Sequence, residues 1–191
     1  MILRKKYLFA ALLGAAFTLT GSALLQRLYD AVGGELLGIL FGAVNGSIWE
    51  SAKTLLLPYL IWSVLEVMSL RLPLHRFTVV KALSLYALGG AYLLLQTGGV
   101  GAVPSAVLSV MTAFTLSVGL HLSPLSLRGW FAPAVAALFL FLALYFSLTP
   151  FPPHHPIFRD PATGMYGIIP RHFDYGAAAL DTLYTAEKSP L

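Results

Sequence analysis

The residues best suited to chemistry form one polar cluster, residues 45–53 (NGSIWESAK), between two apolar stretches. The stretch before it begins near Leu36, and the stretch after it ends near Leu70. Glu50 is the acid of this cluster, and a glutamate in an apolar setting can accept a proton, a cation or a basic ligand. We therefore take the cluster as the first candidate for a functional site.

The same residues also have a purely structural interpretation. Ser47 and Glu50 have the spacing of a capping box, in which a serine begins a helix and a glutamate follows three residues later. Glu50 and Lys53 are spaced to pair on one helix face. Trp49 has the chemistry of an anchor at a membrane interface. Both interpretations predict that a helix restarts here, and they differ in whether Glu50 is free for a ligand.

Composition indicates what surrounds this cluster. The chain has 191 residues, of which 58% are hydrophobic and only 10% are charged, whereas a soluble domain has about 25% charged residues. The net charge of +4 comes from basic residues dispersed between apolar runs, so nucleic acid is not an expected partner. The chain contains no cysteine, which excludes disulfide and thiolate chemistry. The expected partner of most of the surface is the lipid bilayer.

Apolar runs of 18 to 20 residues match the thickness of a bilayer core when helical. We predict an all-α fold, a polytopic transmembrane bundle with one domain over residues 1–149. A polar break at 26–30 is expected to end the first span. The alternative interpretation of this first apolar run is a cleaved signal peptide. The predicted spans are 7–25, 51–70, 78–95, 104–121 and 130–149.

The apolar segment 35–44 is too short to cross a membrane as a helix, and we expect a re-entrant or half helix there. Gly34, Gly38 and Gly42 recur every four residues. On a helix they form a smooth ridge that lets another backbone approach, so this ridge is a candidate surface for a membrane protein partner. The alternative is a glycine-tolerant loop.

Basic residues predict the orientation. With five spans and a cytoplasmic N-terminus, the inner side holds seven basic residues and no loop acid, as the positive-inside rule requires. The predicted location is the cell membrane, with the tail outside, whereas a sixth span over 35–44 would move one basic loop to the outside. Glu66 lies about one turn before Arg71 and is expected to reach the inner interface. The inner basic residues are Arg4, Lys5, Lys6, Arg71, Arg76, Lys81 and Arg128.

The tail, residues 150–191, differs from the bundle in composition. It is rich in proline, and residues 158–164 have the Asp-Pro and Gly chemistry of a turn. Residues 176–187 have weak helical character. The histidines at 154, 155 and 172, with Asp160 or Asp174, follow no tight ligand spacing, so no metal site is expected. The sequence contains no Ser/His/Asp order, Walker loop, HExxH or GxGxxG pattern, and we expect no cofactor.

The cluster and the tail turn together resemble a domain-of-unknown-function family of small bacterial integral membrane proteins. Its members carry a motif like NESVWEHLK and a tail like PLFRDPxTGxYG. Here the first motif reads NGSIWESAK over 45–53, and the second reads PIFRDPATGMYG over 156–167. The resemblance extends from Leu28 to Gly167, and the tail motif is the more specific part.

Two departures from that pattern bear on chemistry. This chain has Gly46 where the pattern has Glu, and Ser51 where it has His. A catalytic or metal-binding cluster built on those groups would have lost two of three members. The residues that remain are those that capping and docking require, so the resemblance implies membership without an activity.

These observations support three hypotheses. The first is a non-enzymatic bundle that binds a small ligand or a partner at the outer face, where the helix break at residues 45–53 and the tail turn at residues 158–167 form one site. The second is a membrane enzyme acting on lipid or peptide with Glu50 as general base, and the third is an accessory subunit of a membrane complex. The candidate site residues are Asn45, Ser47, Trp49, Glu50, Lys53, Arg159, Asp160 and Tyr166.

Overall fold

The computed structural model describes residues 2–32, 34–70 and 72–169. The fold is all-α, as the apolar runs predicted. Its helices are α1 (Ile2–Ala31), α2 (Leu36–Phe41), α3 (Ile48–Leu70), α4 (Leu74–Thr97), α5 (Ala102–Leu122) and α6 (Phe131–Ser147), with two 3₁₀ turns, η1 (Arg128–Trp130) and η2 (Pro156–Phe158).

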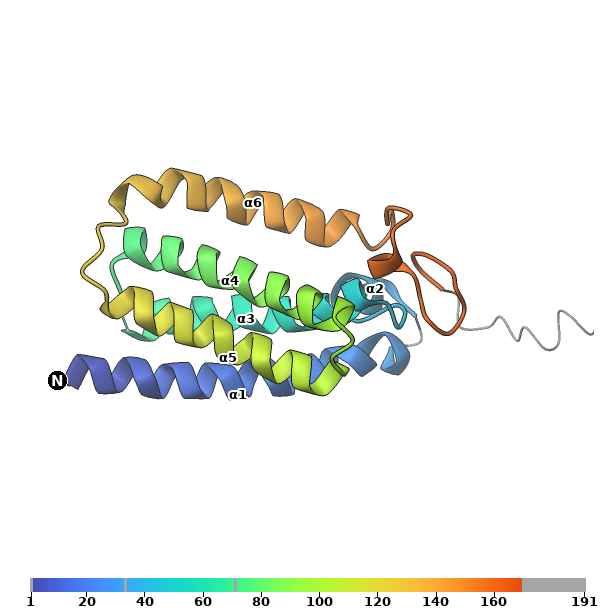
Figure 1. Ribbon diagram of the computed structural model, residues 1–191, viewed down its shortest axis with the longest axis horizontal. Helices are drawn as coiled ribbons and strands as arrows, with labels where there is room; N and C mark the ends of the chain where they lie inside the picture. Colours follow the sequence, from blue (N-terminus) through green and yellow to red (C-terminus); the bar gives the residue numbers. More distant parts are fainter. Residues whose placement is uncertain (1, 33, 71, 170–191) are drawn as a thin grey trace, which may run out of the picture.

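The five long helices lie side by side, and successive ones run in opposite directions (Figure 1). The central helix α4 packs against α3, α5 and α6, and α1 packs against α3 and α5. The start of α1 and the loop between α5 and α6 lie at one end of the bundle. The short helix α2, the helix break and the tail lie at the other end.

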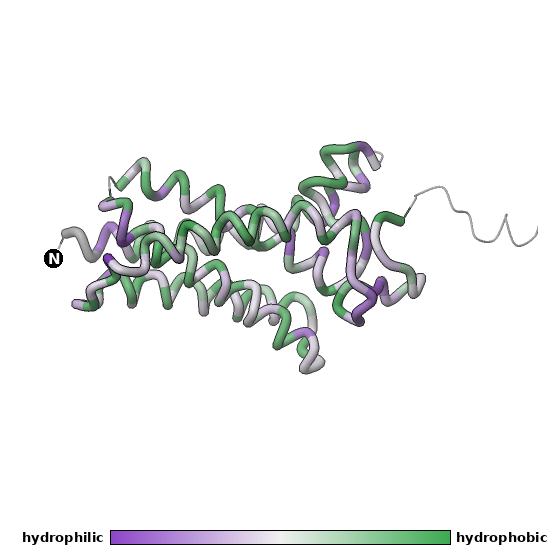
Figure 2. Tube along the Cα trace, turned by 90° about the horizontal axis from the view of Figure 1, so that it is seen from above, coloured by the Kyte–Doolittle hydropathy of each residue, from purple (hydrophilic) through white to green (hydrophobic). Residues whose placement is uncertain are grey.

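Among the described residues, five helices are long and apolar enough to cross a membrane. Large apolar side chains cover their outer surfaces, including Phe9 (64% exposed) and Phe139 (69% exposed). Hydrophobic residues follow the length of the helices, and hydrophilic residues gather toward the two ends of the bundle (Figure 2). An apolar surface of this extent requires lipid around it, so the chain is a multi-pass membrane protein in contact with the bilayer.

The helix interiors pack through small residues and a few large ones. Ser105, Ser109, Ala113 and Ser117, which recur every four residues along α5, are all buried. Small side chains let neighbouring helices approach closely, and α5 makes an extensive contact with α4 along its length. The four-residue spacing of these small side chains therefore coincides with the packing face of α5.

The polar segment 26–30 does not end α1, contrary to expectation. The helix continues to Ala31, and Tyr29 is buried. The last turns of α1 lie against α2, so they bury an aromatic ring that the local sequence marked only as part of a break. Tertiary packing thus extends a helix through residues that would otherwise be at a polar end.

The glycine ridge packs inside this chain. A Cβ atom added at Gly38 would lie 2.8 Å from the Cα atom of Tyr29, and one at Gly42 would lie 2.8 Å from the Tyr29 nitrogen. These two glycines therefore let α2 rest on the backbone of α1, which covers the surface expected to face another protein. The six residues of α2 rise only about 9 Å at 1.5 Å per residue.

Candidate functional site

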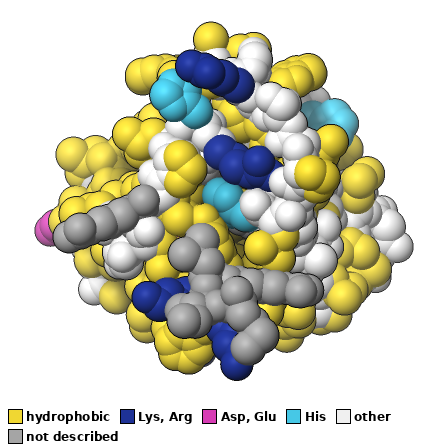
Figure 3. All heavy atoms as spheres, turned by 90° about the vertical axis from the view of Figure 1, so that its left-hand side faces the viewer, with side chains coloured by type: hydrophobic (Ala, Val, Ile, Leu, Met, Phe, Trp, Pro, Cys, Tyr) yellow, Lys and Arg dark blue, Asp and Glu magenta, His cyan; other side chains and the backbone are white. Residues whose placement is uncertain are grey.

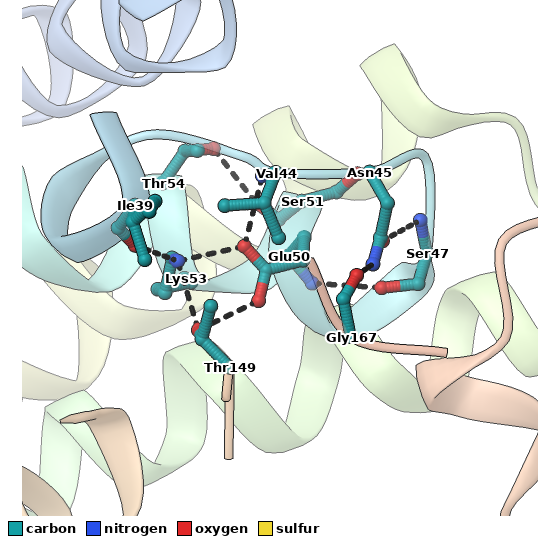
Figure 4. Close-up of polar contacts among 10 residues, drawn as sticks. All are labelled: Ile39, Val44, Asn45, Ser47, Glu50, Ser51, Lys53, Thr54, Thr149 and Gly167. Carbon is teal, nitrogen blue, oxygen red and sulfur yellow. Dashed lines mark hydrogen bonds and ion pairs between the residues drawn. The ribbon is translucent and has the colours of Figure 1, made fainter. Parts of the chain in front are cut away.

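The helix break begins with a serine cap at the start of α3. The Ser47 hydroxyl accepts a hydrogen bond from the Glu50 backbone N–H at 3.3 Å. The reciprocal bond of a capping box does not form, because the Ser47 N–H donates to Asn45 Oδ1 at 2.8 Å. The Glu50 side chain is therefore released from the cap and points toward other segments (Figure 4).

The Glu50 carboxylate is buried and surrounded by donors. Its Oε2 atom lies 2.7 Å from Lys53 Nζ and accepts the Val44 N–H at 3.2 Å. Its Oε1 atom accepts the Thr149 hydroxyl at 2.8 Å. Only 2% of Glu50 is exposed, so these donors replace water around the charge. The predicted pairing of Glu50 with Lys53 is confirmed.

The Lys53 ammonium completes this arrangement. In addition to Glu50, it donates to Thr149 Oγ1 at 3.0 Å and to the Ile39 carbonyl at 3.3 Å. An ammonium has three N–H groups, and the three acceptors match them. We call Glu50, Lys53 and Thr149 the latch, because they join α2, α3 and the chain that follows α6.

Thr149 was absent from the residues expected at this site. It lies 99 positions after Glu50 in the sequence and directly after α6. The sequence feature that could have indicated Thr149 is a hydroxyl residue at the end of the fifth apolar run. There the chain returns to the end of the bundle where the helix break lies. No local spacing relates the two residues.

The tail turn contacts the helix break directly. Asp160 Oδ1 accepts the Gly46 N–H at 2.9 Å, and Asn45 Nδ2 donates to the Gly167 carbonyl at 2.7 Å. Asp160 Oδ2 accepts the Thr163 N–H at 2.9 Å and the Thr163 hydroxyl at 2.7 Å. One aspartate therefore shapes its own turn and fastens it to the break.

These bonds set the ionisation of Asp160. Burial of the side chain raises its pKa, and hydrogen bonds from Thr163, Gly46 and the Ala162 N–H lower it. The hydrogen bonds prevail, and the pKa of Asp160 is held below its usual range. Donors that face a carboxylate favour its charged form, so the docked tail carries an ionised Asp160.

Trp49 and Tyr166 occupy different surroundings. The Trp49 ring packs on Phe158, with ring centroids 5.6 Å apart, and is buried. The tail therefore covers the Trp49 ring, and the expectation that this ring anchors the chain at a membrane interface is wrong. Tyr166 stacks with His154 at 5.0 Å, and its backbone bridges that of Arg159.

A pocket of about 690 Å³ opens where the break meets the tail. Arg159 is exposed, and its Nε donates to the Gly164 carbonyl at 3.1 Å. Gln96 Nε2 has no hydrogen-bond partner within the described part of the chain. Of the eight candidate residues, Arg159 and Asp160 line the pocket. Its full lining is Gly46, Ile48, Gln96, Pro156, Arg159, Asp160, Pro161, Ala162, Thr163 and Gly164.

A second ion pair was missed in the sequence. Lys81 Nζ lies 2.7 Å from Glu66 Oε2, and both side chains are buried. Glu66 therefore does not extend to the membrane interface, and Lys81 does not belong to the basic loop. The reason is that Lys81 lies about two turns inside α4 and faces α3, where each charge meets the other. The signal in the sequence was one acid and one base placed inside two successive apolar runs.

Metal binding has no geometric basis over residues 2–32, 34–70 and 72–169, where no group of three or more possible His, Cys, Asp or Glu ligands occurs. His172, Asp174 and the expected helical stretch 176–187 lie outside the described residues. His75 and His121 contact residues at the end of the bundle remote from the break: His75 packs on Phe131, and His121 packs on Tyr7.

Comparison with known proteins gives a family and no activity. The model of a family of unknown function, DUF6512, matches residues 3–168, which includes all the long helices, the break and the tail turn. Neither the curated proteins nor the solved structures contain a match to the chain. The match extends the resemblance seen in the sequence toward the N-terminus, and the chain belongs to the DUF6512 family.

Proposed function

We propose that this membrane protein binds a small anionic ligand in the pocket between the helix break and the tail turn, on the outer side of a bacterial cell membrane. The observation that carries the proposal is the pocket itself, which combines the exposed guanidinium of Arg159 with backbone from two segments far apart in sequence. Its volume of about 690 Å³ is within the range of small-molecule sites, about 300–1,000 Å³.

The free hydrogen-bond donors around the pocket favour an anion. Asp160 lines it, but its oxygens accept hydrogen bonds from Gly46 and Thr163. Arg159 commits its Nε to the Gly164 carbonyl, which leaves its two terminal nitrogens for a ligand. A guanidinium binds carboxylate or phosphate with two parallel hydrogen bonds, and this is the interaction that we assign to Arg159.

The remaining candidate residues act as supports in this proposal. Glu50 and Lys53 are enclosed in the latch, and Asn45 holds the Gly167 carbonyl. Together they fix the break and the tail relative to each other before a ligand arrives. A site that is held in its binding geometry loses less conformational freedom on binding.

The rival hypotheses have less support. A general base must reach the proton that it removes, whereas the Glu50 carboxylate already accepts three donors in a buried setting. An accessory subunit was expected to bind its partner through the glycine ridge, and that ridge rests on α1 of the same chain.

The orientation is part of the proposal. Lys and Arg side chains, together with His, gather at the end of the bundle opposite the tail (Figure 3). The positive-inside rule favours the cytoplasm for such an end, and in this proposal the pocket therefore lies outside. A topology reporter fused after Leu191 should show that the C-terminus lies on the outer side of the membrane. Activity on the cytoplasmic side would contradict this orientation.

The ligand proposal is tested by thermal unfolding of the purified protein in mild detergent. The probes are short dicarboxylates, amino acids and phosphate monoesters, with neutral sugars as controls. At least one anionic class should raise Tm in a saturable manner, and Arg159→Gln should abolish the rise. Arg128→Gln, at the opposite end of the bundle, should preserve it. A panel without any Arg159-dependent shift would overturn the proposal.

A further inference from the structure

A second pocket lies at the end of the bundle opposite the tail. The start of α4 and the connection between α5 and α6 enclose about 280 Å³. The side chains around it include three that are cationic or can become so, namely His75, Arg76 and Arg128, and its lining contains no acid. The charge of this pocket is therefore positive.

Arg76 is a fixed part of the pocket. Its Nη2 donates to the Leu120 carbonyl at 2.6 Å and also to the Ser123 carbonyl, and its Nη1 donates to the Leu125 carbonyl at 3.1 Å. These acceptors are neutral, so they hold the guanidinium in place without cancelling its charge. Within the described ranges Arg76 Nε has no hydrogen-bond partner, and neither Arg76 nor Arg128 forms an ion pair.

The pocket lies where a bilayer would place its headgroups. Arg128 begins η1 at the start of the span that extends to Ser147. Beside it, Trp130 is 64% exposed and Leu125 is 56% exposed. Exposed tryptophan at the end of a membrane helix is typical of the interface between lipid tails and water. A ligand here can contact cationic groups and an apolar surface at once.

We propose that this pocket binds the phosphate group of an anionic phospholipid. Arginine pairs closely with phosphate oxygens, and basic pockets between membrane helices suit anionic lipid headgroups. His75 packs on the Phe131 ring, with centroids 4.7 Å apart, which sets the position of its imidazole at the rim. Leu125 and Trp130 then contact the upper part of the acyl chains. The proposal does not depend on a ligand at the tail pocket.

The test uses the full chain in a neutral detergent with dioctanoyl phosphatidylglycerol as the probe. Binding is measured by native mass spectrometry and by the shift in Tm. The comparison probes are dioctanoyl phosphatidylcholine, which has the same tails and no net charge, and inorganic phosphate, which has no tails. We expect phosphatidylglycerol to bind at least tenfold more tightly than either comparison probe.

The variants identify the site. The double variant His75→Gln with Arg128→Gln should weaken phosphatidylglycerol binding about tenfold or more. Replacing Arg128 by lysine instead of glutamine in that double variant should recover part of the binding. Both residues are exposed, so the fold should tolerate the changes, and an unchanged Tm without lipid checks this. Arg159→Gln should have no effect on lipid binding.

Three results would overturn the proposal. Equal affinity for the two phospholipids would show that charge is not recognised, and equal affinity of the double variant would show that lipid binds elsewhere. Inorganic phosphate binding as tightly as phosphatidylglycerol would identify a free phosphate site in place of a lipid site.

Discussion

Helix α3 carries two buried ion pairs that differ in how they are built. Glu50 pairs with Lys53 on the same helix, and Glu66 pairs with Lys81 on α4. The two acids are 16 positions apart, or about 24 Å at 1.5 Å per residue. Both pairs have an N–O distance of 2.7 Å and almost no exposure. Their surroundings are different.

The Glu50 pair is surrounded mainly by polar groups, although the Tyr145 ring centroid also lies 5.9 Å from Lys53 Nζ. Thr149 joins both of its charges, and the backbone of α2 and of the break supplies one acceptor and one donor. Removing two charges from water is costly unless further hydrogen bonds satisfy them. Here these bonds come from α2, the helix break and the segment after α6. The ion pair on α3 therefore stabilises the packing of these four parts of the chain against one another.

The Glu66 pair is enclosed by aromatic rings. Lys81 Nζ lies 5.4 Å from the ring centroid of Tyr59 and 5.5 Å from those of Phe77 and Phe114. The negative face of a ring attracts a cation without forming a hydrogen bond. Over the described residues, Glu66 has Lys81 as its one hydrogen-bond partner. This pair therefore depends more strongly on both of its members, and it fastens α3 to α4.

The largest expected effect is the loss of Lys81. Lys81→Met leaves Glu66 buried without a partner among the described residues, and breaking a buried pair costs about 3–5 kcal/mol. We expect Tm in detergent to fall sharply. The double change Glu66→Leu with Lys81→Met should recover most of that loss, because no charge stays buried. A single variant as stable as the parent would contradict the dependence of this pair on both partners.

Loss of Lys53 should have a smaller effect on stability and a larger effect on the tail. In Lys53→Met, Glu50 keeps the donors from Thr149 and Val44, and we expect a loss of about 2–3 kcal/mol. Because the chain has no native cysteine, Ala162→Cys gives a single labelling site on the exposed turn. Its mobility, read from an attached spin label, should rise in Lys53→Met and stay unchanged in Lys81→Met. Equal mobility in both variants would mean that the latch does not hold the tail.

The hydroxyl of Thr149 tests the bridge within the latch. Thr149→Val keeps the shape of the side chain and removes its bonds to Lys53 and Glu50, for an expected loss of about 1–2 kcal/mol. The measurement is the midpoint of denaturant unfolding in detergent micelles. Thr149→Ser should retain most of the stability. A serine variant as unstable as the valine variant would assign the effect to packing of the methyl group.

Gly46 tests the close contact between the break and the tail. A Cβ atom at this position would lie 2.8 Å from Asp160 Oδ1, so Gly46→Ala should displace the turn and cost about 1 kcal/mol. Gly90→Ala is the control, because a Cβ atom there has nothing within 4 Å and alanine favours a helix. Glutamate at position 46, as in the pattern that the sequence resembles, should loosen the turn further. An undisturbed turn in Gly46→Ala would contradict the need for glycine.

The smallest expected effect is the response to acid. Because the pKa of Asp160 is lowered in the fold, its contribution is complete above about pH 4 and is lost as the pH falls through the lowered value. A spin label on Ala162→Cys should therefore become more mobile at low pH. Asp160→Asn should be mobile at every pH. A parent protein whose turn stays immobile through that range would show that the carboxylate does not hold it.

Much of the architecture follows from the sequence. The all-α class was evident because apolar runs of about 20 residues have one folded form in lipid, a helix that satisfies its own backbone. The start of a new helix at Ser47 and the pairing of Glu50 with Lys53 could also be predicted, because capping patterns and i, i+3 pairs are local in the sequence. The sequence also marked Asn45 and Asp160 as candidates, and both make contacts where the break meets the tail.

The tertiary structure decided which partners these residues have. Thr149 joins Glu50 across 99 positions, and Lys81 turns toward Glu66 instead of toward the basic loop. The glycine ridge rests on α1, and Trp49 lies under Phe158. Sequence spacing specifies which side of a helix a residue occupies, but the neighbour of that side depends on how helices pack. That is why the polar cluster at 45–53 could be found from its residues alone, while the contents of its latch and the pocket beside it required the fold.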